Sequence, residues 1–137
     1  MGLLRAFALL IEEHDDAGGL DLVLVGPAGW GDDAAERELL TRLGDRVHVT
    51  GRLDDDELAA AYSGARAFAF PSIWEGFGLP VLEAMAYGAP VVTSSGTCMA
   101  EVTGDVGLLA DPASPREIAD RLAEAVGPAH DELALAG

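Results

Sequence analysis

Two glutamates stand on either side of a glycine-rich turn in the segment PSIWEGFGLPVLEAM, residues 71–85. The second of them, Glu83, lies in a run of otherwise apolar residues that predicts a helix over 79–87, and a helix that is apolar nearly all round is expected to be buried. An unpaired buried carboxylate is costly. Glu83 is therefore predicted to have a partner, either a structural donor, such as backbone N–H groups or an arginine, or a pair of ligand hydroxyls.

The turn between the two glutamates is suited to an anion. Gly76 and Gly78 remove side chains where a backbone can approach a ligand closely, and the start of the following helix presents free N–H groups with a partial positive charge. Because the chain has few cations, the N–H groups of Gly78 and Leu79 form the best predicted phosphate site. A tight connection between strand and helix is the other explanation for the two glycines.

The first glutamate, Glu75, precedes the predicted helix start. A glutamate in that place is explained either by its favourable position near the helix dipole or by contact with the same ligand. Trp74 and Phe77 flank the turn, and they are interpreted as packing residues in preference to stacking platforms.

The elements that must position this turn alternate along the chain. Short apolar strands are predicted at 21–25, 46–50, 66–70, 90–94 and 106–110, and helices at 2–18, 32–44, 54–65, 79–87, 100–102 and 111–127. Such alternation is typical of an α/β domain with a doubly wound, mostly parallel, Rossmann-like sheet covered on both faces. Ligands of these folds bind at the carboxyl ends of the strands, so the loops to consider are 26–31, 51–54, 71–78 and 94–99.

Capping residues mark three of the helix starts. Asp32 or Asp33 is predicted to cap the helix over 32–44, the acidic cluster 54–56 opens the next helix, and Ser114 is predicted to pair with Glu117 in a capping box. No linker or repeat interrupts the pattern, so residues 1–137 are predicted to form a single domain.

Charge and composition exclude some classes of function. The 24 acidic residues outnumber the eight basic ones, which are all arginine, and the formal net charge is -16. A surface of this sign repels polyanions, which argues against nucleic-acid binding. The single cysteine, Cys98, allows no internal disulfide, the three histidines show no metal-ligand spacing, and no apolar run reaches the roughly 20 residues that span a bilayer. We therefore expect a cytoplasmic protein with no transmembrane segment and no metal.

The segment PSIWEGFGLPVLEAMAYGAPVVTSS closely resembles the E-x7-E signature of the retaining GT-B glycosyltransferases of family 4 (group 1), with Glu75 and Glu83 as its glutamates. The segments LVLVGPAGW, VHVTGRLDDDELAAAYSGARAFAFPS and AEVTGDVGLLADPASPREIADRLAEAV resemble successive elements of that family's C-terminal, donor-binding domain. The resemblance covers residues 2 to about 126. It implies a nucleotide-sugar-binding domain, the C-terminal half of a GT-B fold truncated at both ends.

The resemblance implies a role for each residue of the turn. Glu83 would bind the ribose hydroxyls of a nucleotide sugar, while Glu75, the residue implied in catalysis, would contact hydroxyls of the transferred sugar and help to hold it for reaction. The residues between them would meet the donor diphosphate through the backbone: Gly76, Phe77, Gly78 and Leu79.

Two other loops are implied in donor binding. Arg52 and Leu53, which follow the strand over 46–50, would lie beside the nucleobase and contact it through main-chain atoms. Gly26 and Pro27, at the end of the first strand, would line the same cleft.

Parts of the family pattern are not matched. The family has a strand and an Arg...Lys pair shortly before the helix that matches GLLRAFALL, and Arg5 on that helix takes neither cationic role. An N-terminal acceptor domain is also unmatched. Because the two cations neutralise the donor diphosphate, this chain alone is predicted to have little or no transferase activity.

The predicted function is therefore part of a hexosyltransferase that moves a sugar, with retention, from a UDP-, GDP- or ADP-sugar to an acceptor hydroxyl, without another cofactor. The signature is compatible with several sugars and fixes no acceptor. Peripheral association of a full-length enzyme with a membrane stays open. The alternative is a stand-alone or remnant nucleotide-sugar binding module without catalytic activity. A sugar-nucleotide epimerase and a receiver-like interaction protein are less well supported by the residues.

Overall fold

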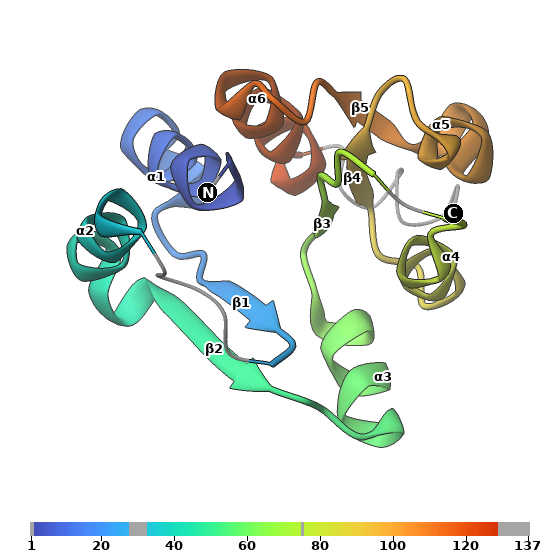
Figure 1. The fold of residues 1–137 in the computed structure, drawn as a ribbon, viewed down its shortest axis with the longest axis horizontal. Coiled ribbons are helices and arrows are strands. Elements are labelled where there is room, and N and C mark those ends of the chain that lie inside the picture. The colour runs from blue at the N-terminus through green and yellow to red at the C-terminus, as the bar shows by residue number, and fades with distance from the viewer. Residues whose placement is uncertain (1, 28–32, 75, 129–137) are drawn as a thin grey trace.

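The computed structural model describes residues 2–27, 33–74 and 76–128. Within them, six α-helices alternate with five short strands, and a single 3₁₀ turn follows each of α1, α2 and α5 (Figure 1). The elements are α1 Gly2–Glu13, β1 Leu22–Val25, α2 Ala34–Leu43, β2 Val47–Gly51, α3 Asp55–Gly64, β3 Phe68–Phe70, α4 Leu79–Ala86, β4 Val91–Ser94, α5 Cys98–Thr103, β5 Leu108–Ala110 and α6 Pro115–Val126.

The predicted order of elements is confirmed, with one difference in the first helix. A continuous helix was expected over 2–18, but α1 ends at Glu13. His14 is extended (φ −123°, ψ 108°), and a separate 3₁₀ turn, Asp15–Ala17, follows. Ala17 is buried in the core, so this break turns the chain inward before it enters β1.

The strands are parallel, as predicted, and they are divided between two sheets. β1 pairs with β2, whereas β3, β4 and β5 form a second sheet in that order. β1 and β3 are thus edge strands, and no strand among the described residues pairs with both of them. The parallel α/β architecture is confirmed, but its sheet is discontinuous because no backbone ladder joins β1 to β3.

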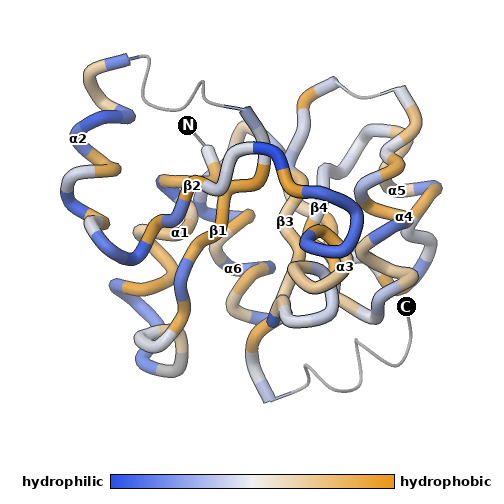
Figure 2. Tube along the Cα trace, turned by 90° about the horizontal axis from the view of Figure 1, so that it is seen from below, coloured by the Kyte–Doolittle hydropathy of each residue, from blue (hydrophilic) through white to orange (hydrophobic). Residues whose placement is uncertain are grey.

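Helices cover the strands on two sides. In Figure 1, α1, α2 and α6 lie on one side, and α3, α4 and α5 lie on the other. The larger core joins both sheets to the first group of helices through Leu4 and Leu10 of α1, Leu24 of β1, Val92 of β4 and Ile118 of α6. Each such side chain contributes about 1.5–3 kcal/mol when fully buried, so one shared core holds the two sheets together. Figure 2 shows hydrophobic strands near the middle and a largely hydrophilic α2 at the outside.

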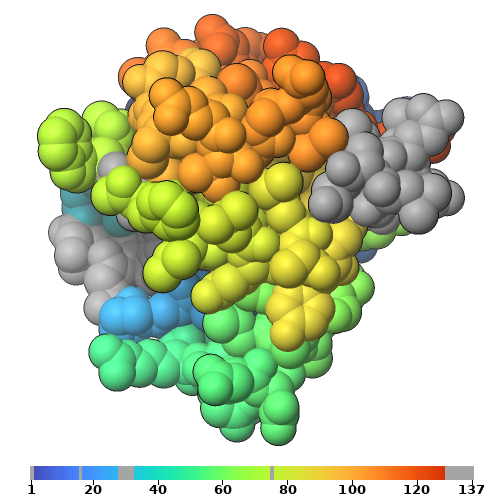
Figure 3. Space-filling view, turned by 90° about the vertical axis from the view of Figure 1, so that its right-hand side faces the viewer, coloured from blue at the N-terminus to red at the C-terminus, as the bar shows by residue number. Residues whose placement is uncertain are grey.

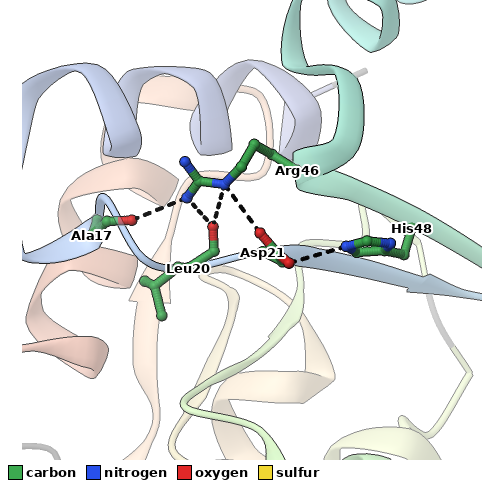
Figure 4. Close-up of polar contacts among 5 residues, drawn as sticks. All are labelled: Ala17, Leu20, Asp21, Arg46 and His48. Carbon is green, nitrogen blue, oxygen red and sulfur yellow. Dashed lines mark hydrogen bonds and ion pairs between the residues drawn. The ribbon is translucent and has the colours of Figure 1, made fainter.

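Polar contacts fasten the amino ends of β1 and β2 (Figure 4). Arg46 donates from Nε to Asp21 Oδ1 over 3.0 Å and to the carbonyl of Leu20 over 2.9 Å, and its Nη2 donates to the carbonyls of Leu20 and Ala17. His48 Nε2 lies 3.0 Å from Asp21 Oδ2. The hydrogen bond with His48, followed by that with Arg46, holds the pKa of Asp21 below its usual value. This cluster lies at the strand ends opposite to the predicted ligand site.

Side-chain caps fix where α2 and α3 begin. Asp33 Oδ1 accepts from the N–H of Glu36 over 2.8 Å, which confirms a predicted cap at Asp33, while Asp32 lies outside the described residues. The acidic cluster opens α3 as predicted: Asp54 accepts from the N–H of Glu57, and Glu57 accepts from the N–H of Asp54, which is a complete capping box.

The capping box predicted at α6 forms only in part. Ser114 Oγ accepts from the N–H of Glu117 over 3.2 Å. Glu117 Oε2, however, accepts from the N–H of Asp111 over 2.9 Å, because the N–H of Ser114 already donates to the carbonyl of Asp111. The carboxylate therefore secures the turn after β5 and does not return to the cap residue.

Candidate functional site

The loops after β1 and β2 lie side by side. The N–H of Gly26 donates to the carbonyl of Gly51 over 2.9 Å, in an isolated bridge that follows the parallel ladder. This bond places Gly26 and Pro27 next to Arg52 and Leu53, so two of the predicted pairs are brought together. Pro27 and Arg52 are exposed, and Leu53 is half-buried. Residues 28–31 of the predicted loop lie outside the described residues.

The turn before α4 presents backbone N–H groups at the start of the helix. Gly78 is the N-cap of α4 in a left-handed conformation (φ 77°, ψ 41°), and its carbonyl accepts from the N–H groups of Val81 and Leu82. Pro80 has no N–H to donate. Among the described residues, the N–H groups of Gly78 and Leu79 have no hydrogen-bond acceptor. The turn thus presents the backbone donors on which the predicted anion site depends, and the site itself stays a prediction.

Buried hydroxyls from β4 hold the loop that leaves β3. Thr93 Oγ1 donates to the carbonyl of Phe70 over 2.9 Å, and Ser94 Oγ donates to the carbonyl of Ser72 over 2.6 Å. Both donors are fully buried. Ser72 Oγ in turn donates to the carbonyl of Trp74 over 3.0 Å. The path of the loop towards the glycine turn is thus set by side chains of the neighbouring strand.

Thr93 and Ser94 were not singled out by the sequence analysis. The sequence signal for them is the position of two hydroxyl residues at the end of the apolar strand PVVTS. A buried hydroxyl needs an acceptor, and in a parallel sheet the nearest one is a carbonyl of the adjacent strand or of the loop that leaves it.

The start of α5 supports the same turn from within the protein. Met99 is fully buried, and a Cβ added at Gly78 would overlap the end of its side chain. Cys98 Sγ lies 3.6 Å from the carbonyl oxygen of Gly76, in hydrogen-bonding geometry. Figure 3 shows the face on which α4 lies between α3 and α5. The glycine turn therefore rests on a second core, formed by Tyr62, Val81, Ala84, Ala89, Val91 and Met99.

The structure corrects the expectation that Glu83 is buried. Only Val81 and Ala84 of α4 are buried, whereas Glu83 is exposed, because the outer face of the helix is not covered by another described element. The prediction that Glu83 has a partner is confirmed: Tyr62 Oη donates to Glu83 Oε2 over 3.0 Å. The partner is a tyrosine, which the sequence analysis did not consider.

Tyr62 is held firmly in this position. It belongs to the last turn of α3 and only 6% of its surface is accessible. Its ring meets Phe68 edge to face at 5.4 Å and stacks on Tyr87 at 5.8 Å between ring centroids. Burial, together with the hydrogen bond to Glu83 and the charge of that carboxylate, raises the pKa of Tyr62 to about 12. The hydroxyl therefore stays protonated and donates to Glu83 at neutral pH.

The aromatic residues of the turn do not pack into the protein, contrary to the expectation. Trp74 is 89% exposed and Phe77 is 62% exposed. Glu75, which lies between them in the sequence, is outside the described residues. Among the described residues, no group of three or more His, Cys, Asp and Glu side chains is arranged to hold a metal ion, and no helix is both long and apolar enough to cross a membrane.

The glycine turn, the helix start and the accessible carboxylate lie beyond the end of one strand of a parallel α/β domain. Open α/β sheets bind their ligands in this place, so the fold and the site define a ligand-binding α/β domain. The family model described as "Glycosyl transferases group 1" matches residues 2–127, and the chain belongs to this family.

Two relatives illustrate the likeness in sequence. The O-antigen chain mannosyltransferase B of Escherichia coli is 45% identical over 114 residues, which cover 81% of this chain and 29% of that protein. The D-inositol 3-phosphate glycosyltransferase of Corynebacterium urealyticum is 36% identical over 140 residues, covering 98% of this chain and 33% of that protein. The chain spans about a third of the length of these relatives.

Solved structures share the fold. The C-terminal domain of a glycosyl transferase group 1 family protein (LpcC) from Francisella tularensis superposes with a TM-score of 0.78 at 25% identity, covering 98% of this chain and 72% of that one. Anabaena Alr3699/HepE, solved in complex with UDP-glucose, gives a TM-score of 0.77 at 24% identity and covers 98% of this chain and 37% of that one.

Proposed function

We propose that this chain is the donor-binding part of a retaining family 4 glycosyltransferase, which transfers a sugar from a nucleoside diphosphate sugar to an acceptor hydroxyl. The observation that carries the proposal is the pair of ligand groups on α4. Among the described residues, the N–H groups of Gly78 and Leu79 at its start have no acceptor, and the exposed carboxylate of Glu83 follows one turn later. A nucleoside diphosphate offers the matching chemistry, because its diphosphate is anionic and its ribose carries two hydroxyls that donate to a carboxylate.

The remaining residues of the turn receive their roles within the same proposal. Glu75 would contact hydroxyls of the transferred sugar and act in catalysis, while Gly76 and Phe77 would meet the diphosphate through the backbone. Catalysis would then depend on stabilising the charge that develops on the leaving diphosphate, for which the start of α4 supplies fixed dipoles.

The loops after β1 and β2 are proposed to complete the donor site. Arg52 and Leu53 would contact the nucleobase through main-chain atoms, and Gly26 and Pro27 would line the cleft beside it. The bond between Gly26 and Gly51 supports this proposal, because it holds both loops together at the carboxyl ends of parallel strands.

The comparisons support the class of reaction. The sequence relatives are named as mannosyl- and glycosyltransferases, and a protein of the same fold was solved with UDP-glucose. Because the likeness to that structure concerns the fold alone, the base and the sugar are to be found by testing UDP, GDP and ADP in turn.

Calorimetry with these three nucleotides and their 2′,3′-dideoxy counterparts tests the proposal. Glu83→Ala is expected to weaken binding of the preferred ribonucleotide roughly tenfold or more, and to leave the dideoxy nucleotide nearly unaffected, because only the former has hydroxyls to donate. Glu38→Ala, an exposed glutamate of α2, is the matched control. Absence of binding at millimolar nucleotide, or equal losses for both ligands, would contradict the proposed donor site.

A transfer assay separates the enzyme from a binding module. The family pattern supplies two cations near the diphosphate, and loss of one interaction with developing charge costs about 3–4 kcal/mol in the barrier. The 137-residue chain is therefore expected to bind nucleotide but to show little or no turnover of a nucleotide sugar. Measurable turnover by the purified chain would show that it needs no further residues.

A further inference from the structure

We infer that Tyr62 is a positioning residue for the nucleotide site: its hydroxyl holds one oxygen of Glu83 so that the other oxygen is directed to the ribose hydroxyls. The inference rests on the proposed function of Glu83. It adds a residue from α3, outside the glycine turn and outside the E-x7-E segment, to the machinery that binds the donor.

The geometry gives Tyr62 a firm hold on the carboxylate. Tyr62 Oη lies 3.0 Å from Glu83 Oε2, and no other hydrogen bond to the Glu83 side chain is found among the described residues. Glu83 itself is exposed, so without this bond its carboxylate would turn freely in solvent. An exposed side chain that must bind a ligand loses rotamer freedom on binding, and a fixed neighbour reduces that loss in advance.

The tyrosine is itself fixed by packing. Phe68 of β3 and Tyr87, the residue that directly follows α4, contact its ring from two sides. The N–H of Tyr87 donates to the carbonyl of Glu83 over 3.2 Å, so Glu83 and Tyr87 are one turn apart on the same face of α4. Tyr62 therefore contacts this face at two points, once through its ring and once through its hydroxyl.

The two oxygens of Glu83 are thus unlike. Oε2 accepts from a buried tyrosine, whereas Oε1 has no partner among the described residues. A carboxylate has about four lone-pair positions, two on each oxygen, so Oε1 can accept from both hydroxyls of a vicinal diol. Because the tyrosine hydroxyl restrains the position of Oε2, it narrows the orientations of the carboxylate and the directions from which the diol can approach.

Tyr62→Phe tests the inference with little disturbance, because the phenyl ring keeps the contacts with Phe68 and Tyr87. The change is expected to weaken binding of the preferred ribonucleotide roughly 3- to 10-fold and to leave the 2′,3′-dideoxy nucleotide within roughly twofold. Tyr87→Phe is the matched control, since it also removes one hydroxyl from the stacked pair. NMR relaxation of the Glu83 side chain, measured without ligand, should show greater mobility in Tyr62→Phe and not in Tyr87→Phe.

The outcomes separate this inference from the proposed function. If Glu83→Ala distinguishes the two nucleotides and Tyr62→Phe does not, the donor site stands and the positioning role is overturned. Equal losses for both nucleotides in Tyr62→Phe would show a merely structural role and would also overturn it. If no nucleotide binds at all, the proposed function fails. The NMR measurement then tests the positioning role by itself, and equal mobility of the Glu83 side chain in the wild-type chain and in Tyr62→Phe would overturn it.

Discussion

Gly78 and Met99 lie so close together that no side chain fits between them. A Cβ built on Gly78 would stand 2.5 Å from Met99 Cε and would overlap the sulfur as well. Gly78 also has a φ of 77°, in the region that residues with a Cβ rarely adopt. Glycine is therefore required at position 78 for two reasons: it allows the left-handed conformation, and it leaves room for the side chain of Met99.

Gly78→Ala is expected to be strongly destabilising. The left-handed conformation alone costs about 1–2 kcal/mol for a residue with a Cβ, and displacement of the buried Met99 adds to that cost. Urea unfolding measures the change. The start of α4 would shift at the same time, so nucleotide binding should also weaken.

Gly96→Ala separates the cost of the left-handed conformation from the cost of overlap with Met99. Gly96 has a φ of 68°, but no atom lies within 4 Å of the place that a Cβ would take, so this variant carries the conformational cost without the steric one. Equal losses of stability in the two variants would show that contact with Met99 contributes nothing.

Ser94→Ala is predicted to loosen the loop before the glycine turn. The substitution removes the buried hydroxyl that donates to the carbonyl of Ser72, which costs about 1–3 kcal/mol of unfolding free energy. Ser95→Ala is the matched control, because that side chain is exposed in the next position along the chain. Chemical denaturation gives the stability, and amide shifts of residues 72–78 should move in Ser94→Ala alone. A loss below the error of the measurement would contradict the assigned role of β4.

The ionisation of Tyr62 reports on its bond to Glu83. The chain has only two tyrosines, so Tyr87→Phe leaves Tyr62 as the sole tyrosine whose ultraviolet absorbance changes with pH. In that background Tyr62 should titrate near its raised pKa of about 12. Adding Glu83→Gln should lower this pKa but not restore the ordinary value, because burial is the larger cause. An unchanged titration would contradict the hydrogen bond.

The same shift predicts how stability depends on alkaline pH. A raised pKa in the folded state means that the unfolded chain releases the tyrosine proton more readily. The contribution of Tyr62 is therefore fully present below its ordinary pKa of 10.0 and is lost as pH rises towards about 12. The free energy of unfolding of the wild-type chain should therefore fall more steeply across this pH range than that of Tyr62→Phe. Denaturation at several pH values measures both. If the difference in unfolding free energy between the two proteins does not change with pH, the raised pKa of Tyr62 is contradicted.

Local patterns were sufficient to predict the order of the elements and most helix starts, because a run of apolar residues or a capping aspartate acts on its own neighbourhood. Asp33 and the Asp54 and Glu57 pair behave in this way. The capping box at Ser114 formed only in part because its N–H was taken by the carbonyl of Asp111, a choice made by the turn after β5.

The surroundings of Glu83 could not be predicted from the same patterns. Its exposure depends on which elements cover α4, and its partner Tyr62 stands 21 positions away on another helix. Likewise, the support that Ser94 gives to the loop depends on the pairing of β3 with β4. These are tertiary contacts between distant segments, and they cannot be predicted from the glutamates and glycines of the turn.

The division of the sheet predicts unequal local stability. In the part of the chain that the structure describes, β1 and β2 form a parallel pair of only two strands, and Val23, Val25 and Val49 are between 42% and 50% exposed. β4, by contrast, is paired on both sides and all its residues are buried. Two-stranded pairs are marginal alone, so the first pair is expected to open with a smaller free energy than the second sheet.

Amide hydrogen exchange tests this difference directly. The N–H groups that bond β1 to β2 should exchange roughly tenfold or more faster than those of Val92 and Thr93 in β4, under conditions where exchange reports the opening equilibrium. The shared core through Leu24 opposes separation of the pair, so Leu24→Ala should speed exchange in β1 and β2 far more than in β4. Equal protection across both sheets would mean that the larger core, and not strand pairing, sets the stability of every strand.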